Sequence, residues 1–310
     1  MKSDTLSFVK ENAPGAAVVG QVTVTTLLVV ALATSDSLGA WLLAQCLLAI
    51  LWMQWFIVLH EAGHGTLFTS STLNNVVGHV AGAMSLVPFY SWRAIHREHH
   101  VWTGWQDRDP TTDQLAVKDR SPRMLALLDN MWACGVPVVG LFYRINNFWQ
   151  PRRLRRLFPR GHVAMRHNMM ALLAVYGLAV AVFGAWSIVA TFGLGLLLHL
   201  MLFEPFMLSQ HTHVPQRIAG TRRVTPFTPA DQVQFTRSLA FPPWVSRWVW
   251  FHFDRHEAHH AHPTIPGYCL GLITTFEPNA MPWWRWLRAA KRMPARVFLF
   301  QNRFQSGRFI

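Results

Sequence analysis

The sequence has few cysteines. Cys46, Cys134 and Cys269 are the only three in 310 residues, and no two of them form a C-x-x-C pair. This spacing indicates neither a disulfide framework nor a thiolate metal site. Acidic residues are also few, 15 against 28 lysines and arginines, which gives a formal net charge of +13. No basic helix with interleaved aromatic residues accompanies this charge, so we expect no nucleic-acid partner. Anionic lipid headgroups or an acidic protein fit the charge better.

Lysine and arginine are absent from two long stretches, Glu11 to Trp92 and His167 to Gln216. Hydrophobic residues make up 51% of the chain and charged residues 14%, and the apolar residues are concentrated in a few long runs. Runs of about 20 apolar residues can span a bilayer as helices. The four expected spans are Ala16 to Thr34, Gly39 to Leu59, Asn168 to Trp186 and Ser187 to Leu208. Short turns would join them into two hairpins. We therefore expect an all-α membrane protein with a single integral-membrane domain over residues 1–310.

The basic residues fall into three blocks, 2 before Glu11, 13 from Arg93 to Arg166 and 13 from Arg217 onward. Under the positive-inside rule all three blocks are cytoplasmic. Residues 60–167 and 209–310, and both termini, are then expected on the cytoplasmic side. Asn74 to Trp92 is uncharged, but Gly78, Gly82 and Pro88 interrupt it, which favours an interfacial segment over a further span. Met124 to Gln150 is expected to be an amphipathic helix lying on the membrane.

Histidines are concentrated in three clusters. HEAGH at 60–64, HREHH at 96–100 and HEAHH at 256–260 place eight of the sixteen histidines in fifteen positions. Each cluster has helical spacing, i and i+4 in HEAGH and i, i+3 and i+4 in the other two, which projects side chains from one face of a helix. Eight imidazoles exceed the ligands that one ion needs, because a catalytic zinc takes about three protein ligands. The clusters therefore predict two metal ions at one membrane face.

Other interpretations of the clusters are weaker. HEAGH alone fits the H-E-x-x-H pattern of zinc proteases, with Glu61 as general base, but such a site needs one further ligand rather than two further clusters. A basic patch would favour lysine or arginine over histidine, which is largely neutral at pH 7. A metal transport protein predicts ligands within the membrane rather than at one rim of it. A metal centre at the cytoplasmic rim is favoured.

The clusters and their flanks resemble the membrane fatty acid desaturase superfamily. The segments LVPFYSWRAIHREHH (Leu86 to His100), SQHTHVP (Ser209 to Pro215) and HEAHHAHPTIPGY (His256 to Tyr268) are similar to delta-12 and omega-3 acyl-lipid desaturases. The resemblance covers roughly residues 40–270. It implies two iron ions held by histidine, dioxygen as co-substrate, a lipid acyl chain as substrate and a cis double bond as product. Hydroxylases and ketolases of fatty or isoprenoid chains, and terminal-alkene-forming enzymes, use similar clusters and remain alternatives.

The resemblance also implies which residues form the site. The expected ligands are His60, His64, His96, His99, His100, His256, His259, His260 and a ninth histidine after the fourth span, for which we favour His211 over His213. A ligating imidazole commonly donates its other N–H to a carboxylate. Possible supporting residues are Glu61, Glu98, Asp107, Asp109, Asp254, Glu257 and His213.

Two expectations lie outside the ligand set. His199 and Glu204 are intramembrane polar residues that we expect to pair, and a satisfied contact between helices is favoured over a role around a substrate headgroup path. The chain has no Gly-rich dinucleotide fingerprint and no fused haem-binding domain of the cytochrome b5 type. The resemblance therefore implies a separate electron donor, a ferredoxin or a cytochrome b5-like protein.

Overall fold

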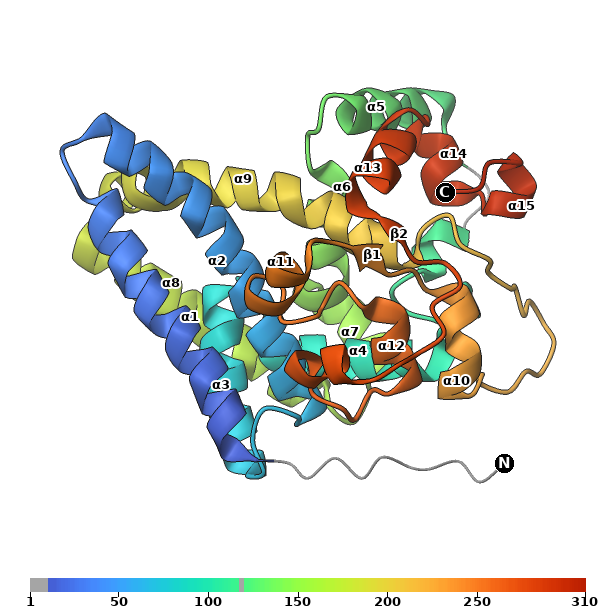
Figure 1. The fold of residues 1–310 in the computed structure, drawn as a ribbon, viewed down its shortest axis with the longest axis horizontal. Helices are drawn as coiled ribbons and strands as arrows, with labels where there is room; N and C mark the ends of the chain where they lie inside the picture. The colour runs from blue at the N-terminus through green and yellow to red at the C-terminus, as the bar shows by residue number, and fades with distance from the viewer. Residues whose placement is uncertain (1–10, 117–119) are drawn as a thin grey trace.

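A computed structural model describes residues 11–116 and 120–310 (Figure 1). The expected cytoplasmic N-terminus, with its two lysines, lies outside the described residues, as does Lys118. Within the described ranges, four helices are long and apolar enough to cross a membrane. They are α1 (Asn12–Ala33), α2 (Leu38–His64), α8 (His162–Phe183) and α9 (Ala185–His211). The prediction of four long apolar helices is confirmed.

The first hairpin consists of α1 and α2. The hydroxyl of Ser37 caps α2 by accepting from the backbone N–H of Ala40, and Gly65 ends the helix with a left-handed φ of 70°. The sequence predicted a span that stops at Leu59, but α2 continues without a break through His64. At 1.5 Å per residue its 27 residues extend about 40 Å, longer than the hydrocarbon core of a bilayer. The first histidine cluster therefore forms the last turns of an apolar helix.

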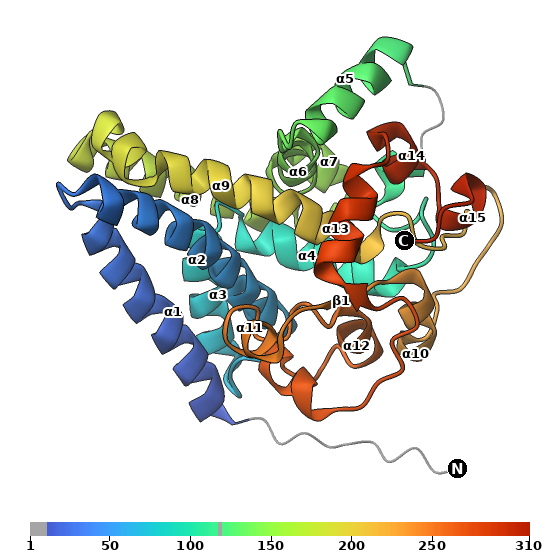
Figure 2. The same ribbon diagram turned by 45° about the horizontal axis from the view of Figure 1, so that its top comes forward.

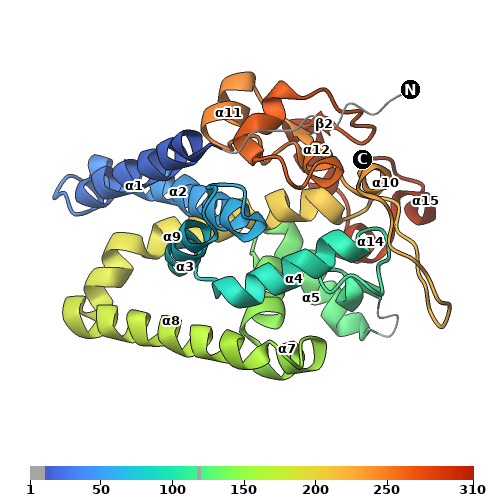
Figure 3. The ribbon, with the colours of Figure 1, turned by 90° about the horizontal axis from the view of Figure 1, so that it is seen from below.

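The second hairpin consists of α8 and α9, which meet at Gly184 with a φ of 78°. The predicted boundary at Trp186 is two residues too late, because a positive φ suits glycine and not the residues after it. Figure 3 shows α9 beside α2 and α8 farther away on the outer side. α9 contains Pro205 and ends at His211, so it also carries a histidine on its last turn.

The segment after α2 folds back along it. α3 (Ser71–Met84) and α4 (Phe89–Trp102) are separate helices. Between them lie Leu86, which has a positive φ of 57°, and Pro88. The 14 residues of α3 give it a length of about 21 Å, which is too short to span a bilayer alone. Gly78 and Gly82 of α3 pack against Phe89 and Val87 so closely that a Cβ at either position would clash. These contacts orient α4, which carries the second histidine cluster.

The single amphipathic helix predicted over Met124 to Gln150 is wrong. The chain forms α5 (Pro122–Ala133) and then α6 (Val138–Arg144), which continues into a π-helix, η2 (Ile145–Trp149). The two parts are bent by 109°. Gly135 adopts a φ of 73°, and Pro137 precedes α6. Because neither residue suits a helix interior, the amphipathic pattern breaks at this point.

The rest of the chain forms a cap of short elements around the histidine-bearing ends of the long helices (Figure 2). These elements are η1 (Asp113–Ala116), α7 (Pro151–Leu157), α10 (Pro229–Gln232), η3 (Val233–Phe235), α11 (Pro243–Trp248), α12 (His256–Ala261), η4 (Gly267–Leu272), α13 (Trp283–Lys291), α14 (Ala295–Phe300) and α15 (Arg303–Ser306). Two short strands, β1 (Leu239–Ala240) and β2 (Met281–Pro282), pair in parallel with Leu239 opposite Met281.

A layer of aromatic side chains lies between the apolar helices and the histidines. Phe56 of α2 makes edge contacts with Trp92 of α4, Phe203 of α9 and Phe253 of the cap, with ring centroids 5.0 to 6.1 Å apart. The ring of Phe253 in turn contacts His60. Buried aromatic contacts of this kind fix the relative positions of the elements that carry the clusters.

Candidate metal centre

Nine histidines converge at the junction of α2, α4, α9 and α12. They form two groups, and in each group one ring nitrogen from every histidine lies within 4.8 Å of the corresponding nitrogens of the others. The five-histidine group contains His60, His64, His96, His100 and His259, and the four-histidine group contains His99, His211, His256 and His260. The nine are the histidines expected as ligands, and their separation into two groups places neighbours such as His99 and His100 on different sides. Their role as ligands remains a prediction.

In the five-histidine group the Nε2 atoms face inward. Nε2 of His96 lies 2.8 Å from Nε2 of His64 and 3.1 Å from that of His100, which lies 3.0 Å from Nε2 of His259. Nε2 of His60 is buried and has no hydrogen-bond partner among the described residues. Lone pairs this close repel one another unless a cation or a proton lies between them. The arrangement therefore fits a bound metal ion.

The four-histidine group has the same inward geometry. Nε2 of His211 lies 3.0 Å from that of His99 and 2.7 Å from that of His256, and the Nε2 atoms of His256 and His260 are 3.1 Å apart. Four imidazoles would occupy fewer coordination positions of a metal ion than five. This group therefore leaves more room around an ion for a small ligand.

Three histidines of the two groups have their Nδ1 atoms held by oxygen acceptors. His60 Nδ1 donates to Glu61 Oε1 at 2.9 Å, and His99 Nδ1 donates to Asp109 Oδ2 at 2.7 Å. His260 Nδ1 donates to Gln232 Oε1 at 2.8 Å. A proton on Nδ1 leaves Nε2 with a free lone pair, so these contacts select the tautomer that binds a metal through Nε2.

Burial favours the neutral form of five of these imidazoles. The pKa values of His96, His100, His256, His259 and His260 are lowered well below their usual range, first by burial and then by neighbouring imidazoles. A neutral imidazole is the form that ligates metal. The donor set is thus available near pH 7, and all-imidazole coordination suits iron, zinc or copper.

The predicted supporting residues divide into two sets. Glu61 and Asp109 contact histidines of the two groups, and Glu61 also accepts from Thr66 Oγ1 and the backbone N–H of Gly267. These contacts occupy the carboxylate of Glu61, so a role as protease general base is not supported. The carboxylates of the other set make different contacts. Asp107 accepts from Ala219 and Gly220, Asp254 from Ser246, and Glu257 from Ser238 and Asn279, while Glu98 has no side-chain partner among the described residues.

His213 lies outside both groups. It has a positive φ of 60°, and its Nε2 lies 2.8 Å from the hydroxyl oxygen of Ser306. Its ring stacks near Phe298 in the cap. His211, by contrast, belongs to the four-histidine group because the last turn of α9 directs it there. The structure therefore brings His211, and not His213, into the four-histidine group.

The expected pair of His199 and Glu204 does not form. His199 Nε2 accepts from Arg144 Nη2 at 2.8 Å, and its Nδ1 donates to the carbonyl of Ala49. Glu204 instead accepts from the backbone N–H of Gly140 at 2.7 Å, near the start of α6. Five residues separate His199 and Glu204 on α9, which directs them to different helix faces. Both are satisfied contacts between helices, but with partners that the sequence did not indicate.

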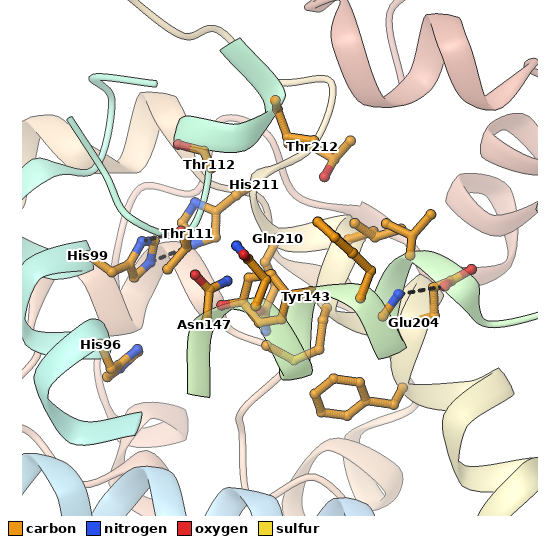
Figure 4. Close-up of a pocket in the computed structure, with 18 of the residues that line it drawn as sticks. His96, His99, Thr111, Thr112, Tyr143, Asn147, Glu204, Gln210, His211 and Thr212 are labelled. Atoms are coloured by element: carbon orange, nitrogen blue, oxygen red, sulfur yellow. Dashed lines mark hydrogen bonds between the residues drawn. The ribbon is translucent and has the colours of Figure 1, made fainter. Parts of the chain in front are cut away.

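A cavity adjoins the histidine groups (Figure 4). His96, His99 and His211 lie on one side of it, and Glu204 lies on the opposite side. Between them the wall is mostly apolar, with Phe142, Phe203, Met207 and Leu208 among its residues. The cavity can therefore receive an apolar chain and bring it beside both groups.

Sequence reasoning missed several polar residues at this site. Gln232 holds His260, while Asn147 of η2 and Gln210 of α9 are buried in the cavity wall. Asn147 Oδ1 and Gln210 Nε2 have no partner among the described residues. Gln210 adjoins His211 in the sequence, which is a weak signal. Asn147 carries no signal, because only the π-helix and the fold bring it to the histidines.

The fold and the site define a mostly helical protein with four helices long and apolar enough to cross a membrane and a histidine cluster at one end of them. The sequence profile described as "Fatty acid desaturase" matches residues 37–297. The chain belongs to the fatty acid desaturase family.

Three individual relatives match parts of the chain at 27% to 32% identity. The chain is 32% identical to a Delta(12) fatty acid desaturase of Mortierella isabellina over 102 residues, which cover 30% of this chain and 26% of the relative. It is 32% identical over 129 residues to an sn-1 acyl-lipid omega-3 desaturase (ferredoxin) of Synechocystis sp., covering 41% and 35%. An sn-1 oleoyl-lipid 12-desaturase of Picosynechococcus sp. is 27% identical over 236 residues, covering 69% and 62%. The chain thus spans less than two thirds of each of these relatives.

Proposed function

We propose that the chain is a dioxygen-dependent desaturase that introduces a cis double bond into a lipid acyl chain. The observation that carries the proposal is the division of nine inward-facing histidines into two adjacent groups. Two iron ions would occupy these groups, one held by five imidazoles and the other by four. Family membership supports iron over the other metals that imidazole binds, and the names of the relatives support a lipid substrate.

Iron bound at these groups would supply the oxidising chemistry with dioxygen that removes hydrogen from an unactivated methylene. The protein's own contribution is placement. The apolar cavity wall binds the acyl chain, and the aromatic layer of Phe56, Trp92 and Phe253 excludes water from the side of the apolar helices. The position of the chain in the cavity then determines which two carbons face the histidines.

The second candidate function is oxygen insertion by a hydroxylase or ketolase at the same site. Asn147 Oδ1 and Gln210 Nε2, buried without hydrogen-bond partners among the described residues in a mostly apolar wall, are the observation that favours it. Such groups could hold an oxygen atom near the substrate. We prefer desaturation, because relatives with matched segments are named as desaturases.

We further propose that the four long helices span the membrane, with the histidines and both termini on the cytoplasmic side. The excess of basic residues outside the spans supports this orientation. Electrons would come from a separate ferredoxin or cytochrome b5-like protein. The relative named as ferredoxin-dependent supports this choice.

Expression in cells of defined lipid composition, followed by profiling of fatty acids and isoprenoids, tests the function. We expect new cis double bonds in lipid acyl chains and two irons per purified chain. Oxygenated products would favour the second candidate. An unchanged lipid profile from a chain that holds two irons and is supplied with a reduced donor would contradict both.

A further inference from the structure

Two short helices of the cap begin side by side. α11 follows β1 and α13 follows β2, and the two strands pair in parallel. The rings of Phe241 and Trp283 stack with centroids 5.5 Å apart and planes 2° from parallel. Because parallel strands leave a sheet at the same end, α11 and α13 start from the same place on the cap.

Both helices expose tryptophan. Trp244 and Trp248 of α11 are 65% and 55% exposed, and Trp283 and Trp284 of α13 are 37% and 50% exposed. Large apolar rings gathered at a surface mark a protein interface or a membrane interface. The indole has an apolar body and one N–H, which is why tryptophan is enriched at the headgroup level of bilayers.

The position of α11 along the long helices indicates a membrane interface. Gln21 of α1 donates its side-chain N–H to the carbonyl of Trp248, and Gln54 of α2 donates to the carbonyls of Trp248 and Val249. Gln21 lies about 14 Å along α1 from Asn12, and Gln54 about 15 Å along α2 from His64. α11 therefore lies alongside the apolar helices rather than beyond their ends.

The charge of the two segments matches lipid phosphate. Arg247 stacks on Trp248 and Arg285 on Trp284, each about 5 Å from the ring centroid. Both arginines are exposed, as is Arg288. Residues 241–250 and 281–292 contain no aspartate or glutamate. Arginine beside tryptophan, without a neighbouring acid in either segment, suits an anionic headgroup layer.

We propose that α11 and α13 form an anchor that lies in the headgroup layer of the leaflet at the histidine end of the protein. The four tryptophans reach the boundary of the hydrocarbon, and Arg247, Arg285 and Arg288 bind lipid phosphates. The occupant of this surface is thus the bilayer itself. The anchor is independent of the metal centre and depends only on the long helices spanning the membrane.

Spin labels in nanodiscs test the depth of the anchor. Labels are attached at Trp244→Cys and Trp284→Cys in full-length protein whose three native cysteines are replaced. Leu178→Cys, on the exposed face of α8, serves as the hydrocarbon reference, and Thr221→Cys, in an exposed cap loop, serves as the water reference. Collision with oxygen, relative to collision with a water-soluble nickel complex, gives the depth of each label. We expect both anchor labels between the two references.

The outcomes separate this inference from the span assignment. If the anchor labels match Thr221 while Leu178 reads as hydrocarbon, the spans are right and the anchor is wrong. If Leu178 itself reads as water, the span assignment fails. Replacing zwitterionic by anionic phospholipid should move the anchor labels deeper, and Arg247→Gln with Arg285→Gln should abolish that shift. An equal shift without the arginines would overturn the phosphate contacts. If the labels are protected from the nickel complex only when an acidic ferredoxin is added, the surface binds a protein partner instead and the anchor is wrong.

Discussion

The side-chain amide of Gln232 accepts the Nδ1 proton of His260 at 2.8 Å. The same amide donates from its Nε2 to the carbonyl of His100 at 2.7 Å. The donor contact fixes the orientation of the amide, so its oxygen must face His260. Gln232 therefore links a histidine of the four-histidine group to the backbone of a histidine in the other group.

Gln232→Leu should weaken iron binding at the four-histidine group by about 10- to 100-fold, since His260 loses the acceptor that fixes its tautomer. Iron titration of the purified chain measures the change. Gln234→Leu is the matched control, because Gln234 is exposed and contacts Asp231 rather than a histidine. Equal iron affinity in both variants would show that the amide does not act on the metal site.

Asp109 and Asp107 offer a second matched comparison. Asp109→Ala should lower iron affinity about 10- to 100-fold, because His99 loses its carboxylate partner. Asp107→Ala removes two backbone contacts in the cap and should leave both irons in place. Iron content after dialysis against a weak chelator distinguishes them. Loss of iron from the Asp107 variant alone would contradict the assignment.

His211→Ala should reduce bound iron from two per chain toward one and abolish desaturation, because the four-histidine group loses a ligand. His213→Ala should retain both irons, since His213 contacts Ser306 outside the groups. Metal analysis and lipid profiling of the two variants decide between them. A chain with His211→Ala that keeps two irons and full activity would refute the ligand set.

Phe203→Leu should change the position or yield of the new double bond, because Phe203 lines the cavity between Phe56 and Arg144. The smaller side chain alters how far an acyl chain can enter. Phe192→Leu is the control, because Phe192 is also on α9 but packs against Trp52 away from the cavity. Mass spectrometry that locates double bonds gives the result, and the same product from both variants would argue that the cavity does not hold the substrate.

His199→Leu should destabilise the fold by about 1 to 3 kcal/mol, because a buried N–H of Arg144 loses its acceptor. Arg144→Met in the same chain should recover part of the loss, since it removes the uncompensated charge. Thermal unfolding in detergent compares the two. If Arg144→Met lowers the stability of the His199→Leu variant as much as it lowers the stability of the unmodified protein, the two residues are not coupled.

Local patterns in the sequence were sufficient to predict the long helices and the histidine clusters. Four apolar runs predict four long helices, and the i, i+4 spacing of His60 and His64 predicts a shared helix face. The bend between α5 and α6 was missed although Gly135 and Pro137 mark it. An amphipathic pattern on both sides of these residues concealed the break.

Contacts between distant segments could not be predicted from the sequence. Gln232 lies 28 residues from His260, and Arg144 lies 55 residues from His199. Nothing in either local sequence indicates the partner, because the fold alone brings them together. The division of the histidines into two groups could not be predicted either, since His99 and His100 are neighbours in sequence but belong to different groups.

α2 contributes His60 and His64 to one group, and α9, which packs against it, contributes His211 to the other. Both histidine-bearing ends are continuous with the apolar parts of their helices. α4 and α12, however, each contribute histidines to both groups, so these two helices act as crosslinks that hold the two groups at a set separation.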